Sequence, residues 1–431
     1  MSRTTAEAME VPLTKPVNRS LVVIAALLIQ LCLGAIYSWS VFTPPLKEAP
    51  FLFSNTQTQA IFSISLLTFA IVMVLAGRWQ AKSGPRIVSL LGGIVLGAGY
   101  ILAGLFGHTF VSQILFIGLI GGAGIGLAYV CPISVGMKWF PDKKGLITGV
   151  AVAGFGFGAL IWVKLAGSWG GLLESMGVLK VFLLYGIIFA AAVTVGSIWM
   201  VNPPAGWKPA GWEPPAPAEG ADSKVGLEGL LPGAMLRQKG FYSLWVMFIF
   251  SSMAGLMIIG NIKLFGIEAL RTSAAAMSEE QASIIAGTAM AVFYSIANGL
   301  GRIIWGGISD RTGRKAALAL MLGLQGIVML VFFWMGSSEY LLYLGATLIG
   351  FNFGGNFALF PAATADLFGA KNVGLNYGYV FTAYGVGGIV GPIMAGIIRD
   401  VFQNWQATFT ICGVALLVAT GIALTLRFRK N

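Results

Sequence analysis

Apolar runs of eighteen or more residues recur along the whole of this 431-residue sequence, separated by short polar breaks. A helical run of this length matches the hydrocarbon core of a bilayer. Lipid excludes an open sheet, because the exposed backbone groups of its edges would have no hydrogen-bond partners. Charged residues make up only 10% of the chain, whereas a soluble protein carries roughly a quarter. The sequence therefore predicts an all-α membrane protein.

The polar breaks divide the chain into twelve predicted membrane-spanning helices. They cover residues 21–43, 58–77, 86–106, 111–135, 145–168, 180–201, 241–264, 282–307, 315–336, 339–363, 374–397 and 403–426. Between the sixth and seventh helices the chain is rich in proline, glycine and acidic residues, a composition that forms a tether and packs no core. The predicted domains are an N-terminal segment 1–20, a six-helix bundle 21–201, a linker 202–240, a six-helix bundle 241–426 and a C-terminal segment 427–431.

Lysine and arginine are distributed unevenly between the two sets of predicted loops. Twenty of the 27 lie in one set and five in the other, while Lys164 and Arg302 lie inside helices. Because loops rich in lysine and arginine stay in the cytoplasm, we expect both termini and the linker to be cytoplasmic, with the protein in the inner membrane. The net charge of +11 then reflects topology, and no nucleic-acid partner is expected. Lys164 lies near the outer end of its helix, so we expect its side chain to reach the interface.

The two halves of the sequence repeat with a constant offset of 229 residues. The segment 77–86, GRWQAKSGPR, aligns with 306–315, GGISDRTGRK, and Pro132 aligns with Pro361 at the same offset. Parallel repeats of this kind place a binding site between the two halves, near the middle of the membrane.

Residue types needed for several other chemistries are scarce or absent. His108 is the single histidine, and the three cysteines all lie in apolar runs, which excludes a disulfide framework and a metal spacing. The phosphate-binding pattern G-x-x-x-x-G-K-[ST] and the hydrolase patterns H-E-x-x-H and G-x-S-x-G do not occur in the sequence. We therefore expect no metal, no cofactor and no enzymatic activity.

The loop 306–315 resembles the signature loop of the major facilitator superfamily. The resemblance implies the major facilitator fold, in which two six-helix bundles rock about a central site. In this loop we expect Gly306 and Gly313 to form a turn too tight for side chains, and Asp310 to interact with a neighbouring helix N-terminus. The aligned loop has Ala81 in place of the aspartate, which argues against a symmetric gate. The expected gating residues are Asp310, Arg311 and Arg314.

Two further segments resemble transporters of small organic anions. The segment 139–145, WFPDKKG, with the glycines and alanines that follow it, is similar to the helix 4–5 signature of monocarboxylate transporters. The run from Asn376 to Tyr384 resembles helix 11 of the oxalate/formate antiporter family, whose oxalate exchangers have a lysine where this chain has Tyr384. The resemblance covers nearly the whole chain outside its termini and linker.

Arg302 is the residue from which most of the expected chemistry follows. A charge inside a spanning helix is costly and marks functional sites, and the planar guanidinium matches a carboxylate. Asn298 lies one turn earlier on the same face and can orient Arg302 or bind substrate. The alternative is that Arg302 extends to the cytoplasmic surface, but the family resemblance, which implies a substrate-binding arginine here, favours a site. The aromatic residues that match cavity positions of the oxalate/formate family are Tyr37, Tyr129, Phe155, Phe353, Phe357 and Tyr384.

These features predict a monomeric secondary transporter of a small monocarboxylate, such as lactate, pyruvate or formate, working by alternating access. An exchanger of oxalate against formate is the alternative within this class, and an anion channel is the alternative outside it. A membrane receptor would need a sizeable soluble output domain, and the sequence has none. No acidic residue lies in the middle of a predicted helix, so a carboxylate proton relay is not expected, and the sequence leaves proton symport and exchange both open.

Overall fold

The computed structural model describes residues 18–140, 144–204, 207–209, 230–273, 277–369 and 372–426, and every regular element in these ranges is a helix. Several long helices consist of more than one segment. The elements of the first half are α1 (Arg19–Leu33), η1 (Gly34–Val41), α2 (Thr43–Lys47), α3 (Asn55–Ser83), α4 (Pro85–Phe106), α5 (Phe110–Gln113), η2 (Ile114–Gly121), α6 (Gly122–Trp139), α7 (Lys144–Ala166) and α8 (Leu172–Ser197).

The second half begins with the short α10, which precedes the long α11. Its elements are α10 (Pro232–Met235), α11 (Lys239–Ser273), α12 (Glu279–Thr288), η3 (Ala289–Tyr294), α13 (Ser295–Thr312), α14 (Arg314–Met335), α15 (Glu339–Phe368), α16 (Val373–Phe402) and α17 (Trp405–Thr425).

Eleven helical stretches of the described residues are long and apolar enough to cross a bilayer. A further helix, α15, has 30 residues but carries Asn352 and Asn356 in its middle, and both side chains are buried. These long helices lie where the sequence predicts the twelve spans, so the all-α membrane class is confirmed. The observed helices extend beyond the apolar runs: α3 continues to Ser83 and α11 to Ser273, because polar residues at the ends continue the helix outside the hydrocarbon region.

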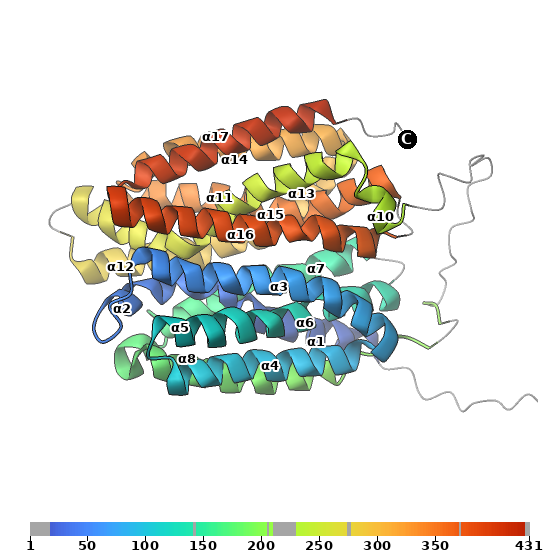
Figure 1. Ribbon diagram of the computed structural model, residues 1–431, viewed down its shortest axis with the longest axis horizontal. Coiled ribbons are helices and arrows are strands. Elements are labelled where there is room, and N and C mark those ends of the chain that lie inside the picture. Colours follow the sequence, from blue (N-terminus) through green and yellow to red (C-terminus); the bar gives the residue numbers. More distant parts are fainter. Residues whose placement is uncertain are drawn as a thin grey trace, which may run out of the picture.

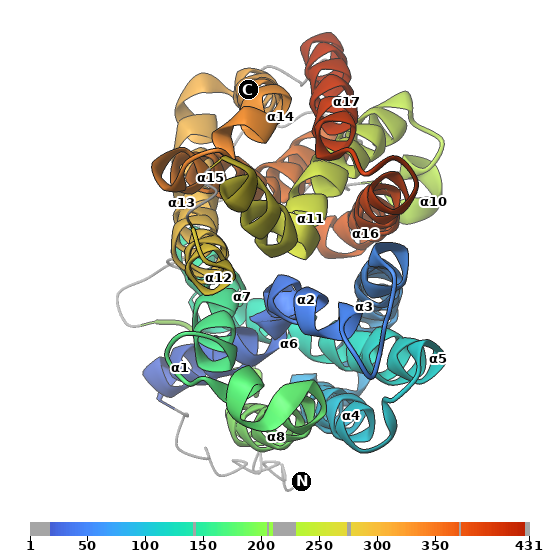
Figure 2. The same ribbon diagram turned by 90° about the vertical axis from the view of Figure 1, so that its left-hand side faces the viewer.

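The helices form two groups that meet along a seam. Figure 2 shows α1 to α8 on one side of the seam and α10 to α17 on the other. Across the seam α3 contacts α16, and α7 contacts α13. In Figure 1 the helices run along the long axis, with α2 at one end of the molecule and α10 at the other. We refer to these as the α2 end and the α10 end.

Polar contacts tie α3 to α16 near both ends of the seam. At the α2 end, the Asp400 carboxylate accepts hydrogen bonds from the backbone and side chain of both Asn55 and Thr56, at 2.6 to 3.1 Å. These residues begin α3, and a helix N-terminus favours a negative charge. At the α10 end, Arg78 Nη2 donates to the Tyr379 hydroxyl at 2.6 Å. Both ends of this helix pair are therefore held across the seam.

The sequence repeat is visible in the backbone at two glycines. Gly84 joins α3 to α4 with φ 84° and ψ 154°, and Gly313 joins α13 to α14 with φ 86° and ψ 154°. Residues other than glycine rarely adopt this conformation, so both turns require the glycine that the sequence supplies 229 positions apart. The prediction of a tight turn is confirmed at Gly313 but wrong at Gly306. Gly306 lies inside α13, where an added Cβ would make only an ordinary contact with Ala358 at 3.7 Å.

One close approach of two backbones positions an aromatic residue at the seam. A Cβ at Gly34 would clash with the carbonyl oxygen of Phe155, and a Cβ at Gly158 would lie 2.8 Å from Gly34. The two glycines therefore let η1 pack directly on α7. Tyr37, in the same η1 segment, is thereby placed with its ring 4.9 Å from the ring of Phe155, edge to face.

Large apolar side chains are exposed on the outside of the helix groups, including Ile71, Ile187, Ile327 and Leu424. In a water-soluble monomer, so much exposed apolar surface would promote association. Around a membrane protein it faces lipid chains. The buried polar side chains of Asn298 and Arg302 lie instead toward the seam.

Candidate substrate-binding site

Arg302 lies on α13 at the seam and is 4% exposed. Its Nε donates to Asn298 Oδ1 at 3.0 Å, one helical turn away, and its Nη1 donates to the Val152 carbonyl oxygen of α7 at 2.8 Å. The second of these hydrogen bonds crosses the seam. The guanidinium carbon lies 4.1 Å from the ring centroid of Phe357, which is a cation–π contact. Arg302 therefore does not extend to the surface.

Two hydrogen-bond donors of this pair make no direct hydrogen bond of good geometry, although the hydroxyls of Tyr37 and Tyr129 lie near the guanidinium. Arg302 Nη2 and Asn298 Nδ2 are both buried and without a hydrogen bond among the described residues. No carboxylate within the described ranges lies at ion-pair distance from Arg302, whereas Arg314 has two such partners and Arg399 has one. A buried cation normally has a counter-charge. The free donors of Arg302 and Asn298 thus suit the two oxygens of a small anion.

Aromatic rings form a continuous wall beside the arginine. The Tyr37 and Tyr384 hydroxyls lie 2.9 Å apart and join η1 to α16 across the seam. Ring centroids of Phe357 and Tyr384 are 5.8 Å apart, and those of Phe357 and Phe353 are 5.5 Å apart. Phe155 in turn contacts Tyr129, at 5.3 Å between centroids. All these rings are buried except that of Phe357, which is partly exposed.

The structure brings the eight predicted site residues together from both helix groups. Three come from the first group and five from the second, and they are linked by the contacts given above: Tyr37, Tyr129, Phe155, Asn298, Arg302, Phe353, Phe357 and Tyr384.

Two further rings belong to this cluster and were not predicted from the sequence. Phe381 stacks on Tyr384 with centroids 4.9 Å apart, and Phe69 contacts Tyr129 at 5.0 Å. Phe381 precedes Tyr384 by three residues and shares its helix face, so the spacing was an available signal. No sequence signal indicated Phe69, because nothing distinguishes it from the other phenylalanines of the sequence.

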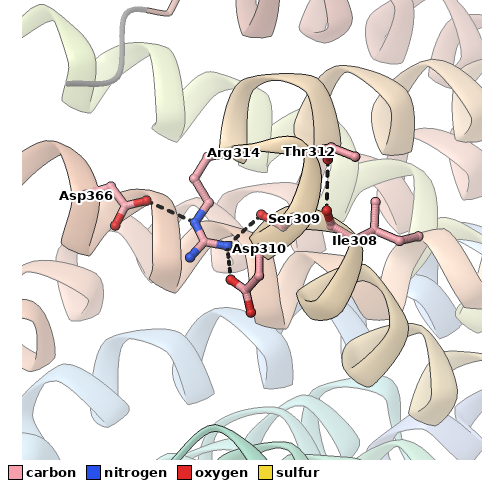
Figure 3. Close-up of polar contacts among 6 residues, drawn as sticks. All are labelled: Ile308, Ser309, Asp310, Thr312, Arg314 and Asp366. Carbon is pink, nitrogen blue, oxygen red and sulfur yellow. Dashed lines mark hydrogen bonds and ion pairs between the residues drawn. The ribbon is translucent and has the colours of Figure 1, made fainter. Parts of the chain in front are cut away.

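The predicted signature loop forms an ion-pair cluster at the turn between α13 and α14, shown in Figure 3. Arg314 Nη1 contacts Asp310 at 2.7 Å, and Arg314 Nε contacts Asp366 of α15 at 2.9 Å. Ser309 Oγ also accepts from Arg314 Nη1, at 2.7 Å. Asp310 thus contacts the arginine side chain that opens α14. The third predicted gating residue, Arg311, is exposed and is not a partner in any of these three contacts.

Lys164 is buried, so the prediction that its side chain reaches the interface is wrong. It is 7% exposed, and its Nζ donates to Thr288 Oγ1 at 2.7 Å and to Ser168 Oγ at 3.3 Å. Thr288 lies on α12, in the other helix group. The seam offers hydroxyl partners that an isolated helix does not, and sequence alone could not reveal them.

The fold and the buried cationic cluster define a multi-pass membrane protein with a central site between two helix groups. Residues 21–288 and 256–431 match the Major Facilitator Superfamily, and the chain belongs to this family.

Three relatives are similar to the chain over most of its length. The oxalate:formate antiporter of Oxalobacter formigenes is 26% identical over 404 residues, which cover 93% of this chain and 89% of the relative. Apicoplast pyruvate carrier 1 of Toxoplasma gondii is 24% identical over 448 residues, which cover 83% of this chain and 80% of the relative. Monocarboxylate transporter 13 of Rattus norvegicus is 25% identical over 407 residues, which cover 92% of this chain and 86% of the relative. The predicted resemblance to the oxalate/formate and monocarboxylate transporter families is confirmed.

Proposed function

We propose that the chain is a secondary transporter that carries a small monocarboxylate, of the lactate, pyruvate or formate class, across the membrane by alternating access. The observation that carries this proposal is the buried Arg302 with a free Nη2, beside the free Nδ2 of Asn298. A carboxylate would accept from both donors in place of the missing partners. Relatives named for oxalate and formate, pyruvate and monocarboxylates support the same class of substrate.

Charge balance favours one carboxylate over two. Arg302 is the only charged residue among the eight clustered side chains, so a monoanion bound there is neutralised. A dianion would leave one negative charge unpaired in a region of low dielectric, at a cost of several kcal/mol. The rings of Phe353, Phe357 and Tyr384 would then contact a short carbon chain. This arrangement supports lactate, pyruvate or formate rather than oxalate as the preferred substrate.

The site lies at the seam, where alternating access requires it. In the proposed cycle, the Asp400 contact with Asn55 and Thr56 opens when the α2 end opens, and the contact of Arg78 with Tyr379 opens when the α10 end opens. In the structure both contacts are formed, and every residue of the cluster except the partly exposed Phe357 is buried. A buried site between two closable ends supports a carrier over a channel, which needs a continuous open path.

We also propose a supporting role in gating for the Arg314 cluster. Arg314 joins the turn between α13 and α14 to Asp366 of α15, so the three helices would move as a unit. The aligned turn of the first half has Ala81 and Pro85 at the positions of Asp310 and Arg314. The cluster therefore has no counterpart there, and the two halves would not be gated symmetrically.

Counterflow in proteoliposomes tests the proposal. Vesicles loaded with unlabelled lactate and diluted into labelled lactate should accumulate label transiently above equilibrium, because a carrier exchanges substrate one for one. Formate and pyruvate should compete with the label. A channel would give simple equilibration without an overshoot, and the absence of any monocarboxylate uptake would contradict the proposal. Repeating uptake in empty vesicles with an imposed pH gradient distinguishes proton symport from exchange, since accumulation without internal substrate requires proton symport.

The membrane topology proposed with this function rests on the uneven distribution of lysine and arginine between the two sets of loops. We propose that bundles 21–201 and 241–426 are joined by a cytoplasmic linker 202–240, with segments 1–20 and 427–431 also cytoplasmic. The protein would act as a monomer in the inner membrane and catalyse no covalent step.

Cysteine labelling in intact cells tests this orientation. Ser337 and Gln238 are both exposed and lie in turns before α15 and α11, respectively. The proposed topology places Ser337 outside and Gln238 in the cytoplasm. An impermeant maleimide should therefore label the Ser337→Cys variant and leave the Gln238→Cys variant unlabelled until the cells are permeabilised. The reverse pattern would invert the topology. The three native cysteines are buried and should give little background.

A further inference from the structure

A cavity of about 320 Å³ lies at the α2 end, between the two helix groups. We call it the vestibule, and its lining includes Val41, Lys164, Ser168, Lys263, Ser283 and Gly287. An adjoining cavity of about 330 Å³ shares Val41 and Lys263 with it and extends to Pro44 and Glu48 beside α2. The vestibule therefore leads from the surface at this end into the seam.

Two lysines from opposite helix groups line the vestibule. Lys164 belongs to α7 and is bonded only to the hydroxyls of Thr288 and Ser168, while Lys263 belongs to α11 and is partly buried. Within the described residues no carboxylate lies at ion-pair distance from either ammonium, although four ion pairs form elsewhere. Two ammonium groups that have no ion-pair partner among these residues attract an anion to the space between them.

Acidic residues at the rim do not cancel this preference. Glu174 and Glu280 line both cavities, and Glu48 and Glu279 line the adjoining one, but all four are exposed, whereas Lys164 is 7% exposed. Water and salt screen charges at the surface far more than charges inside a cavity. The charge of the buried Lys164 is therefore screened less than the charges of the exposed acidic residues at the entrance.

The vestibule lies along the helices that build the central site. Lys164 follows Phe155 by nine residues on α7, a distance of about 14 Å along a helix. Val41 follows Tyr37 by four residues at the end of η1. An anion held by Lys164 is thus two to three helical turns from the aromatic wall and separated from Arg302 by that wall.

We propose that the vestibule is a second anion-binding site, in which Lys164 and Lys263 hold a small carboxylate between solution and the Arg302 site. Because the two ammonium groups come from different helix groups, the bound anion also reduces their repulsion as the α2 end closes. That the anion is a carboxylate rests on the proposed function, whereas the preference of the vestibule for anions does not.

Thiol modification of a vestibule cysteine tests the proposal without requiring transport. The full-length Ser283→Cys variant places a partly exposed thiol in the lining. It is reacted with methanethiosulfonate reagents that carry either a sulfonate or a trimethylammonium group. We expect Lys164→Gln with Lys263→Gln to lower the ratio of anionic to cationic reaction rates about tenfold. Lys180→Gln, which removes an exposed lysine outside the vestibule, should leave the ratio unchanged, and Lys164→Arg should preserve it.

Acetate protection then separates this site from the central one. Acetate should slow the anionic reagent at Ser283→Cys, and should still do so when Arg302→Gln is added to remove the central site. Protection that disappears with Arg302→Gln, or a rate ratio unaffected by the paired lysine substitutions, would overturn the proposal. If acetate protects while no monocarboxylate is transported, the vestibule site stands and the proposed function fails.

Discussion

Arg302→Lys should lower kcat/KM for lactate uptake about a hundredfold, equivalent to about 3 kcal/mol. Lysine keeps the positive charge but lacks the planar fork that donates to two oxygens at once. Its ammonium also cannot bond the Asn298 amide and the Val152 carbonyl in the geometry of the guanidinium, which joins them at 3.0 and 2.8 Å. Initial rates in proteoliposomes over a range of lactate concentrations measure this change.

Arg271→Lys provides the matched control for that substitution. Arg271 lies in the same half of the chain, is about half exposed and pairs with Glu279 at 2.7 Å. Exposed ion pairs contribute little, so we expect uptake by this variant within about twofold of the wild type. If Arg302→Lys transports lactate as well as Arg271→Lys does, the guanidinium is not the carboxylate ligand.

Tyr384→Lys should change which anions the protein binds. The substitution adds a second cation beside Arg302, at the position where the resemblance to oxalate exchangers implies a lysine. A dianion would then be neutralised, while a monoanion would leave one ammonium unpaired. We expect the ratio of oxalate affinity to lactate affinity to rise about a hundredfold, which is about 3 kcal/mol. Tyr37 would also lose the hydroxyl partner that lies 2.9 Å away.

Competition against labelled lactate by oxalate and by formate measures this ratio. Tyr340→Lys is the control, because Tyr340 lies on α15 and is 81% exposed. It adds the same charge outside the cluster and should leave the ratio unchanged. An equal rise in both variants would mean that the added charge acts at long range, and not through the position of Tyr384.

The sequence predicted the helices well because long apolar runs are a physical requirement of the bilayer. The site residues were predicted from Arg302, because a charge inside a spanning helix is costly and marks functional sites. The family resemblance indicated the aromatic residues around it. Gly313 was predicted because its turn is local, and its positive φ depends on the residue itself.

Features that depend on contacts between helices far apart in the sequence, or on where a helix ends, could not be predicted in this way. Asp366 joins the Arg314 cluster from a helix more than fifty residues away, and nothing in the loop pattern indicates it. Lys164 was predicted to extend to the interface because a single helix offers it no partner, but Thr288 of the opposite group does. Gly306 was assigned to the turn because the loop pattern begins there, although α13 continues to Thr312.

The central claim is that a single cation, Arg302, sets a preference for monocarboxylates. Thermal unfolding of the purified wild-type protein tests it directly, because a ligand that binds the native state raises the Tm increasingly as its concentration exceeds its Kd. Lactate, pyruvate, formate and oxalate are titrated at neutral pH and constant ionic strength. At least one of the three monocarboxylates should raise the Tm at lower concentrations than oxalate does. If oxalate stabilises the protein at lower concentrations than all three, the charge argument is wrong and the protein is an oxalate exchanger.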